Sequence, residues 1–403
     1  MHWALSKYSW TLKKFQEHSV TYFSRLLPLL ILIVQGCAGV HKVEPLPSDL
    51  TKDSAGRQLD SWRGLSDEEI EGRVLRLLPP QVKQPEAWAQ DLQSVYQALG
   101  LPHAASTYCA TIAVVQQESS FNAQPVVPGL SKIVRAELNS RASRFLIPQA
   151  LLNKALERQS PTGRTYNQRI DSLRTEKQLN DLFQDLLSEL PFGQDWLEDF
   201  IPVRTAGPMQ VSIAFAQAHA DENDYPFPVQ ESIRDEVFTQ RGGLYFGAAI
   251  LLDYPVSYTE PIYRFADFNA GRYASRNAAF QAAINQLTGS ALSLDGDLLI
   301  YRGKRPSLSA SRVELSLREL VPVLGLSEQE IRDDLLLEKS AEFADTRLYN
   351  RVFRLLEEKT GQLASRETLP EIQLKSPKIT RKLSTKWFAN RVDVRYRDCM
   401  ARR

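Results

Sequence analysis

Glu118 is the residue of this sequence best placed to act as an acid. It follows an apolar run, residues 112–115, and stands in the segment Gln-Glu-Ser-Ser-Phe-Asn that closes the run. The run predicts a buried helix that delivers the carboxyl to its end. Desolvation and the negative end of the helix dipole both favour the protonated carboxyl. Such a group suits general acid catalysis near neutral pH.

Two later segments carry side-chain amides. Residues 206–212, Ala-Gly-Pro-Met-Gln-Val-Ser, predict a Gly-Pro turn into a new helix, with Met209 beside Gln210. Residues 265–272, Phe-Ala-Asp-Phe-Asn-Ala-Gly-Arg, place Phe268 and Asn269 near a helix end. An amide donates and accepts hydrogen bonds, which suits sugar hydroxyl and acetamido groups. Taken singly, the three segments are better explained as a solvated helix end, a turn and a glycine cap.

In this order the three segments resemble the lysozyme-like domain of soluble lytic transglycosylases and goose-type lysozymes. That family shows a catalytic Glu followed by Ser, then a Gly-x-Met-Gln element, then an aromatic-Asn-Ala-Gly element. Residues 241–252, Arg-Gly-Gly-Leu-Tyr-Phe-Gly-Ala-Ala-Ile-Leu-Leu, resemble its Gly-x-x-Tyr-Leu helix. The resemblance covers about residues 104–289. Two positions depart from the family pattern. Pro208 stands where the family usually has an aliphatic residue, and Phe268 stands where it often has Tyr.

The resemblance implies cleavage of the bond between N-acetylmuramic acid and N-acetylglucosamine in peptidoglycan. Glu118 would donate a proton and later accept one, and the substrate's own 6-hydroxyl would attack to leave a 1,6-anhydro end. Five residues would bind the substrate: Ser119, Met209, Gln210, Phe268 and Asn269. Most glycosidases use two carboxyls, and no second one is identified here. Two alternatives stay open: a muramidase that uses water, and a glycan-binding lipoprotein without turnover.

The elements that must position these residues are mainly α-helices. Apolar spacing predicts helices near residues 86–99, 104–117, 238–254 and 277–287, and further ones from Val313 and Ser327. We expect Ser66 and Glu69 to form a capping box at a helix start. We expect residues 292–302 to form a hairpin. We expect a lysozyme-like domain over 63–300, with a charged helical insertion over 130–202 between the Glu and the Met-Gln element. A basic, helical C-terminal extension over 301–403 follows, with one face packed on the body.

The start of the chain predicts export and lipidation. Lys and Arg residues precede a short apolar run, 26–34, which is too short for a membrane span. Val-Gln-Gly-Cys at 34–37 resembles the lipobox of bacterial lipoproteins, which implies a signal peptide over 1–36 and acylation of Cys37. A polar tether over 37–62 follows. Ala38, rather than Asp, favours the outer membrane, so we expect the protein at the periplasmic face of the cell envelope.

Several other functions are excluded or disfavoured by composition. A net charge of +1 over 403 residues gives no global field for nucleic acid. Five scattered His residues form no metal motif, and the sequence shows no GxSxG, P-loop or GxGxxG run, so neither a metal nor a cofactor is expected. The two Cys residues after Cys37, Cys109 and Cys399, either pair in an oxidising compartment or stay separate buried thiols.

Overall fold

The computed structural model describes residues 62–189, 201–303, 305–374 and 383–403. They fall within one structural unit that spans residues 44–403. The expected signal peptide, the lipidation site at Cys37 and all of the tether except its last residue lie outside the described residues.

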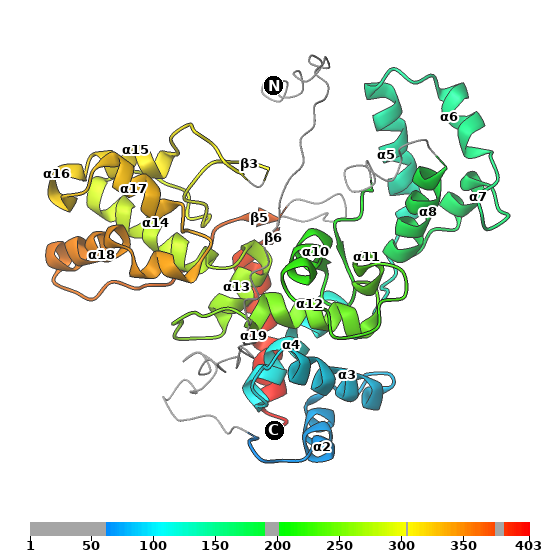
Figure 1. The fold of residues 1–403 in the computed structure, drawn as a ribbon, viewed down its shortest axis with the longest axis horizontal. Coiled ribbons are helices and arrows are strands. Elements are labelled where there is room, and N and C mark those ends of the chain that lie inside the picture. Colours follow the sequence, from blue (N-terminus) through cyan, green and yellow to red (C-terminus); the bar gives the residue numbers. More distant parts are fainter. Residues whose placement is uncertain (1–61, 190–200, 304, 375–382) are drawn as a thin grey trace, which may run out of the picture. The chain divides into compact units, whose positions relative to one another are not determined.

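The described chain is mainly helical, which confirms the predicted class (Figure 1). The helices are α2 (Asp67–Leu77), α3 (Pro85–Ala98), α4 (Ala105–Glu118), α5 (Leu130–Arg144), α6 (Gln149–Leu156), α7 (Tyr166–Asp171), α8 (Glu176–Ser188), α10 (Ile213–Glu222), α11 (Ile233–Glu236), α12 (Gln240–Leu252), α13 (Ile262–Ala270), α14 (Ala274–Thr288), α15 (Arg312–Arg318), α16 (Val321–Leu324), α17 (Glu328–Leu335), η2 (Ala341–Asp345), α18 (Arg347–Thr360) and α19 (Thr385–Met400). Among these residues no helix is long and apolar enough to cross a membrane.

Side-chain caps set many of the helix starts. The predicted box at Ser66 forms, because its hydroxyl accepts from the Glu69 amide at 3.3 Å and the Glu69 carboxylate accepts from the Ser66 amide at 2.8 Å. The same reciprocal pattern begins α7, α8, α15 and α17. Each box satisfies two backbone N–H groups that the first helical turn leaves unpaired.

Helix α4 is the centre of the main core. Every residue from Ala105 to Val115 is buried, as its apolar composition predicts. It packs against α19, α2 and α12. A disulfide joins Cys109 of α4 to Cys399 of α19, which resolves the open question about these two residues.

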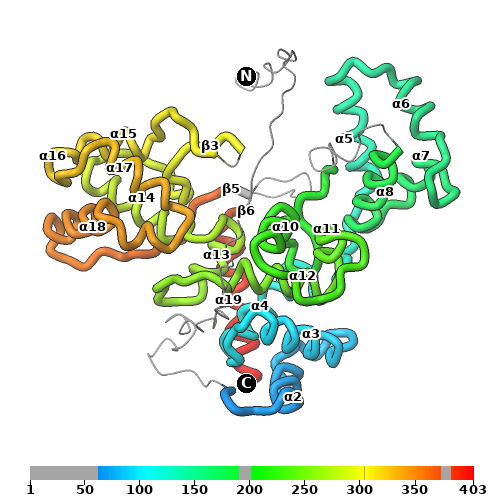
Figure 2. The backbone as a smooth tube through the Cα atoms, in the orientation of Figure 1, coloured from blue at the N-terminus to red at the C-terminus, as the bar shows by residue number. Residues whose placement is uncertain are grey.

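Helices α4 and α13 both pack on α19, which lies beside them in Figure 2. The disulfide joins the early part of α4 to the last turn of α19. Phe265, near the start of α13, packs on Tyr396 with ring centroids 5.7 Å apart, while Asn269, near its end, accepts from Thr385 at the start of α19. The ends of α4 and α13 therefore lie toward the same end of α19.

The apolar residues form two cores that divide the chain differently from the predicted boundary at residue 300. The first core takes residues from α2, α3, α4, α12, α13 and the 130–202 region, and also from α19. The second begins within α14 and continues through α15, α16, α17 and α18; Phe280 of α14 stacks on Tyr349 of α18. The C-terminal residues 301–403 are thus shared between both cores.

Within the described ranges, three pairs of short antiparallel strands form. They are β1 (Thr205–Ala206) with β2 (Val211–Ser212), β3 (Tyr301–Arg302) with β4 (Arg305–Pro306), and β5 (Gln373–Leu374) with β6 (Leu383–Ser384). The hairpin expected within residues 292–302 lies further along the chain, where β3 pairs with β4. Its Asp-Gly segment instead bonds to α14: Gln281 donates to Asp295 at 2.8 Å and accepts from the Gly296 amide at 2.9 Å.

Candidate functional site

Glu118 is the last residue of α4 and is partly buried. Desolvation raises the pKa of its carboxyl from the usual 4.5 to about 7, with no contribution from a neighbouring charge. Within the described chain the carboxyl makes no hydrogen bond or ion pair that would stabilise its charged form. The carboxyl is therefore part protonated near neutral pH, as a general acid requires.

The backbone turns sharply directly after Glu118. Ser120 and Phe121 both adopt left-handed conformations, with φ of 51° and 62°. Such conformations are costly for residues other than glycine, and they concentrate at functional sites. Two further such residues, Gln210 and Tyr273, belong to or follow the other two sequence segments. Four of the six non-glycine residues with positive φ in the described ranges thus lie at or beside the predicted site.

Ser119 serves the helix rather than an open site in this structure. Its hydroxyl donates to the Val115 carbonyl at 3.0 Å, and the residue is 9% exposed. Its predicted contact with the substrate stays a prediction.

Two glutamines on the last turn of α4 were not singled out by sequence reasoning. The side-chain oxygens of Gln116 and Gln117 are buried and have no hydrogen-bond partner among the described residues. Buried amide oxygens without a partner are rare in folded proteins. They are acceptors available to a ligand or to water beside Glu118, and their place directly before the Glu was the signal available in the sequence.

Residues 207–210 form the turn between β1 and β2, so the predicted Gly-Pro turn is present. It closes a hairpin before α10 begins, whereas we expected it to enter the helix directly. Glycines let this turn lie against α12. A Cβ on Gly243 would collide with Pro208, and a Cβ on Gly247 would lie 2.8 Å from the Met209 Cβ and still nearer its sulfur. Met209 is fully buried here, in the apolar core.

Gln210 is held by the insertion. Its amide nitrogen donates to the Glu176 carboxylate of α8 at 3.2 Å, and its oxygen accepts from the Thr205 hydroxyl at 3.2 Å. Glu176 is 8% exposed and was missed by sequence reasoning. Thr175 and Gln178 form a capping box that fixes Glu176 in the first turn of α8, but the sequence does not show that α8 reaches Gln210.

The third segment lies at the end of α13. Asn269 is exposed, and its side-chain oxygen accepts from the Thr385 hydroxyl at 2.9 Å, while Phe268 is partly buried against the first core. Asp267, two positions before the exposed Asn269, is buried. Its carboxylate caps α14 by accepting from the amides of Tyr273 and Ser275 at 2.9 and 2.7 Å, so it has a structural role.

Glu118 and Asn269 both lie toward the N-terminal half of α19. Along α4, Glu118 stands about 14 Å beyond Cys109, and along α19, Thr385 stands about 21 Å from Cys399. Because α4 packs along α19 with Cys109 joined to Cys399 at the far end, Glu118 lies alongside the first half of α19, which begins at the Thr385 that bonds Asn269.

The turn that holds Gln210 is linked to the loop after Glu118 by contacts through α3 and α12. Phe121 packs edge-on against Trp88 of α3 at 5.1 Å, and Asp91, one turn further along α3, accepts from Arg241 of α12 at 2.7 Å. The start of α12 then supports the 207–210 turn. Among the described residues no hydrogen bond joins Glu118 directly to Gln210 or Asn269, so the structure connects the three through their supporting helices.

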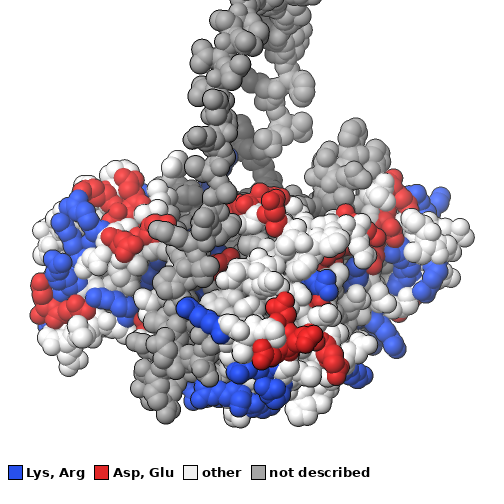
Figure 3. All heavy atoms as spheres, turned by 60° about the horizontal axis from the view of Figure 1, so that its bottom comes forward, with Lys and Arg blue, Asp and Glu red and all other residues white. Residues whose placement is uncertain are grey.

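The electrostatic surroundings do not indicate a metal site. In the described ranges, no group of three or more His, Cys, Asp or Glu residues is arranged to hold a metal ion. The face in Figure 3 carries small groups of both charge signs.

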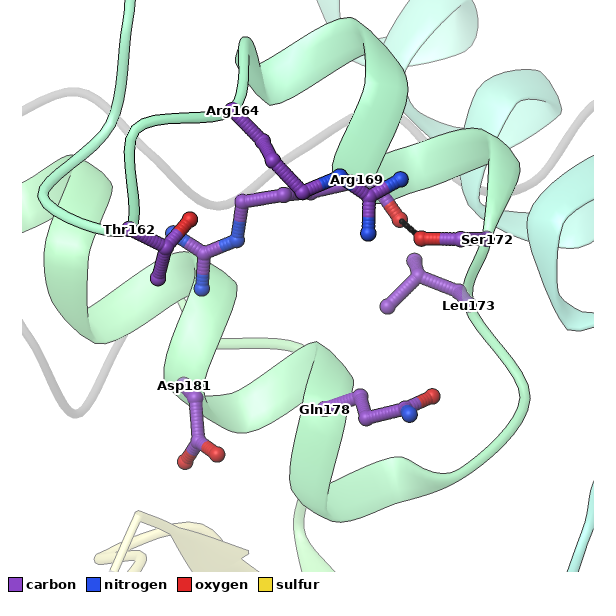
Figure 4. A pocket seen from close by; sticks show the side chains of 7 residues that line it. All are labelled: Thr162, Arg164, Arg169, Ser172, Leu173, Gln178 and Asp181. Atoms are coloured by element: carbon purple, nitrogen blue, oxygen red, sulfur yellow. Dashed lines mark hydrogen bonds between the residues drawn. The ribbon is translucent and has the colours of Figure 1, made fainter.

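A separate hollow of about 220 Å³ lies between α7 and α8 (Figure 4). Its walls include Arg164, Arg169, Gln178 and Asp181. Arg169 is already paired with Asp185 at 2.6 Å, and Gln178 caps α8. These side chains are used to assemble the insertion.

The fold and site define a mainly helical protein with a desolvated acid at the end of its central helix. Residues 81–402 match the family described as "Protein of unknown function (DUF1615)", and the chain belongs to that family. The chain is similar to "Uncharacterized protein YaiW" of Escherichia coli (strain K12), with 46% identity over 381 residues, which is 94% of this chain and 99% of that relative. No solved structure matches the chain. Glu118, Gln210 and Asn269 fall within the residues that define the family, and Cys37 precedes them.

Proposed function

We propose that this protein is a lytic transglycosylase that cleaves peptidoglycan between N-acetylmuramic acid and N-acetylglucosamine, on a lysozyme-like helical fold. The observation that carries the proposal is Glu118, a desolvated carboxyl with a pKa of about 7 beside a strained turn. The order of the Glu-Ser, Gly-Pro-Met-Gln and Phe-Asn-Ala-Gly segments supports the assignment of the fold.

In the proposed reaction Glu118 acts twice. Its protonated carboxyl donates a proton to the glycosidic oxygen as the bond to the muramic acid C1 breaks. The acetamido oxygen of the same sugar stabilises the positive charge that develops at C1. The carboxylate of Glu118 then accepts the proton of the 6-hydroxyl as that oxygen bonds to C1. The products are a chain with a free N-acetylglucosamine end and a chain with a 1,6-anhydro end, and Glu118 is again protonated.

The use of one carboxyl is supported by the surroundings of Glu118. A nucleophilic or water-activating carboxylate would lie roughly 5 to 9.5 Å away in an ordinary glycosidase. A like charge at such a distance on a described residue would raise the pKa of Glu118 further, yet among these residues desolvation alone accounts for its shift. The nearest acid in the third segment, Asp267, is buried and caps α14.

Gln210, Asn269, Ser119 and Phe268 are proposed to bind the glycan, and Met209, which is fully buried, to support the turn that carries Gln210. Gln210 would exchange its bond to Glu176 for bonds to the substrate, and Asn269 is already exposed. Gln116 and Gln117 add two unpartnered acceptors on the same turn as Glu118.

We further propose that the protein is anchored by lipid at Cys37 on the periplasmic face of the outer membrane. The buried disulfide between Cys109 and Cys399 supports a location outside the reducing cytosol, since such bonds form and persist in oxidising compartments. The lipobox-like segment at 34–37 supports the anchor.

One alternative has a specific observation in its favour. The Ser119 hydroxyl bonds back into α4 and the Gln210 amide is occupied by Glu176. A protein that keeps these contacts in the presence of glycan would bind peptidoglycan without cleaving it.

The test is digestion of purified peptidoglycan by the chain from Ala38 onward, followed by mass analysis of the glycan ends. We expect 1,6-anhydro ends from the native sequence. E118Q should release them about 10² to 10⁴ times more slowly, since that is the usual contribution of a general acid. E222Q, which changes an exposed acid of α10, is the matched control and should act like the native protein. Reducing ends would indicate the hydrolase, and binding without new ends would indicate the glycan-binding protein.

A further inference from the structure

The junction of α5 and α6 exposes an apolar tip. Phe145, Leu146 and Ile147 are 65%, 88% and 42% exposed, and Leu151 on α6 is 59% exposed. Single exposed apolar residues are common, but four large ones gathered at one turn are not. We call these four residues the α5–α6 tip. In α6 itself only Leu156 is buried, so the first core does not cover the tip.

Leu146 is exposed at a backbone position that disfavours a side chain. The turn is a Schellman motif, because the Ile147 amide donates to the Ala142 carbonyl at 2.8 Å and the Leu146 amide to the Ser143 carbonyl at 3.2 Å. Leu146 occupies its left-handed position with φ of 56°. Glycine is favoured at that position, since a side chain there is strained. A leucine that is both strained and exposed contributes little to folding, which points to use of its side chain by a partner.

The charge of the surrounding segment indicates the sign of the charge on the partner. The described part of the insertion, residues 130–189, holds ten Lys or Arg and seven Asp or Glu, a net charge of +3, whereas the whole chain carries +1. Arg144 and Lys154 flank the tip and form no ion pair among the described residues. Other arginines of the segment, such as Arg141 and Arg158, are paired with acids.

We propose that the α5–α6 tip inserts into the surface of an anionic lipid bilayer. Apolar and aromatic side chains with cationic neighbours are the combination that binds a membrane interface: the apolar groups enter the boundary of headgroups and acyl chains, and the cations contact anionic headgroups. The inference does not depend on acylation of Cys37 or on glycan cleavage. It gives the insertion its own contact with the membrane.

The test is co-sedimentation of the chain from Ala38 onward, which contains every described element, with lipid vesicles. The vesicles are equal parts phosphatidylglycerol and phosphatidylcholine, or phosphatidylcholine alone. We expect binding to the anionic vesicles. L146G should weaken it about tenfold, because the leucine side chain is lost from the lipid boundary. R144Q and K154Q should each weaken it about fivefold on anionic vesicles only.

L146G also separates membrane binding from folding. Glycine relieves the left-handed strain, so its melting temperature should equal or exceed that of the native sequence. L308G removes an equally exposed leucine outside the tip and is the matched control; it should bind like the native protein. The proposal is overturned if the native sequence does not bind anionic vesicles, or if L146G and L308G bind alike. It is also overturned if L146G instead changes the oligomeric state in the absence of lipid, since the tip then binds a second copy.

Discussion

The raised pKa of Glu118 results from desolvation of its carboxyl rather than from a charged neighbour. It ends a helix whose first eleven residues are buried, and desolvation alone raises the pKa of its carboxyl to about 7. A group of this kind is half protonated near neutral pH and serves both as donor and as acceptor. The proton-donating form is lost as the pH rises above 7, so the cleavage rate should fall there.

The same shift predicts how stability depends on pH. A carboxyl whose pKa is raised by folding stabilises the folded state below its unfolded pKa, near 4.5, and this contribution is lost as the pH rises to 7. E118Q has no charge to desolvate. Its free energy of unfolding should therefore exceed that of the native sequence by up to about 3 kcal/mol above pH 7, and the difference should vanish below pH 4. Urea denaturation of both proteins across this range is the measurement. A difference that does not vary with pH would show that Glu118 is solvated.

At the residue scale, the local sequence predicts whether a side chain is buried, but not which residue it contacts. The apolar run before Glu118 was sufficient to predict its burial. The contact between Gln210 and Glu176 was not predictable, because it depends on how the insertion docks. The unpartnered oxygens of Gln116 and Gln117 likewise depend on packing that no spacing rule describes.

At the scale of elements, glycines of α12 allow the 207–210 turn to reach its place. A methyl group on Gly247 would lie 2.8 Å from the Met209 Cβ, inside a fully buried contact. We expect G247A to lower the free energy of unfolding by about 1 to 3 kcal/mol, the usual result of overpacking.

Gly72 provides the matched control. It lies within α2, and a Cβ there meets nothing within 4 Å. G72A should raise stability by about 0.5 to 1 kcal/mol, since alanine is the better helix former. Chemical denaturation compares the two variants. If G247A also stabilised the protein, Met209 would not be packed on α12 as described.

Helices were predicted from sequence more reliably than the hairpin. The periodic segments that became α3, α4, α12 and α14 have strong internal patterns, so their existence follows from local spacing. The Asp-Gly segment at 295–296 has the local features of a turn, but its polar groups bond to Gln281 of α14. A contact to a helix outside the segment overrode the local pattern.

At the scale of the whole molecule, α19 connects the last residues of the chain to α4. The disulfide closes a loop of 290 residues and is fully buried. Apolar residues at helical spacing near the C-terminus predicted a helix with one face packed on the body. They did not predict its contact with α4 of the first core, because that contact spans most of the chain. The two apolar cores likewise cut across the boundary expected at residue 300.

The disulfide should contribute strongly to stability. Closing so long a loop reduces the entropy of the unfolded chain, and we expect C109A/C399A to lose about 3 to 5 kcal/mol. Thermal melting with and without a reductant measures this. The native sequence should melt lower when reduced, whereas the double variant should not respond. Equal melting of the native sequence in both conditions would mean that the bond does not form.

The central claim is that Glu118 alone supplies the protein's catalytic carboxyl and that the substrate's 6-hydroxyl takes the place of water. The most direct test is digestion of peptidoglycan in water labelled with heavy oxygen, with mass analysis of the new ends. We predict anhydro ends that carry no label and that disappear in E118Q. Ends that incorporate the label would show attack by water and contradict the claim.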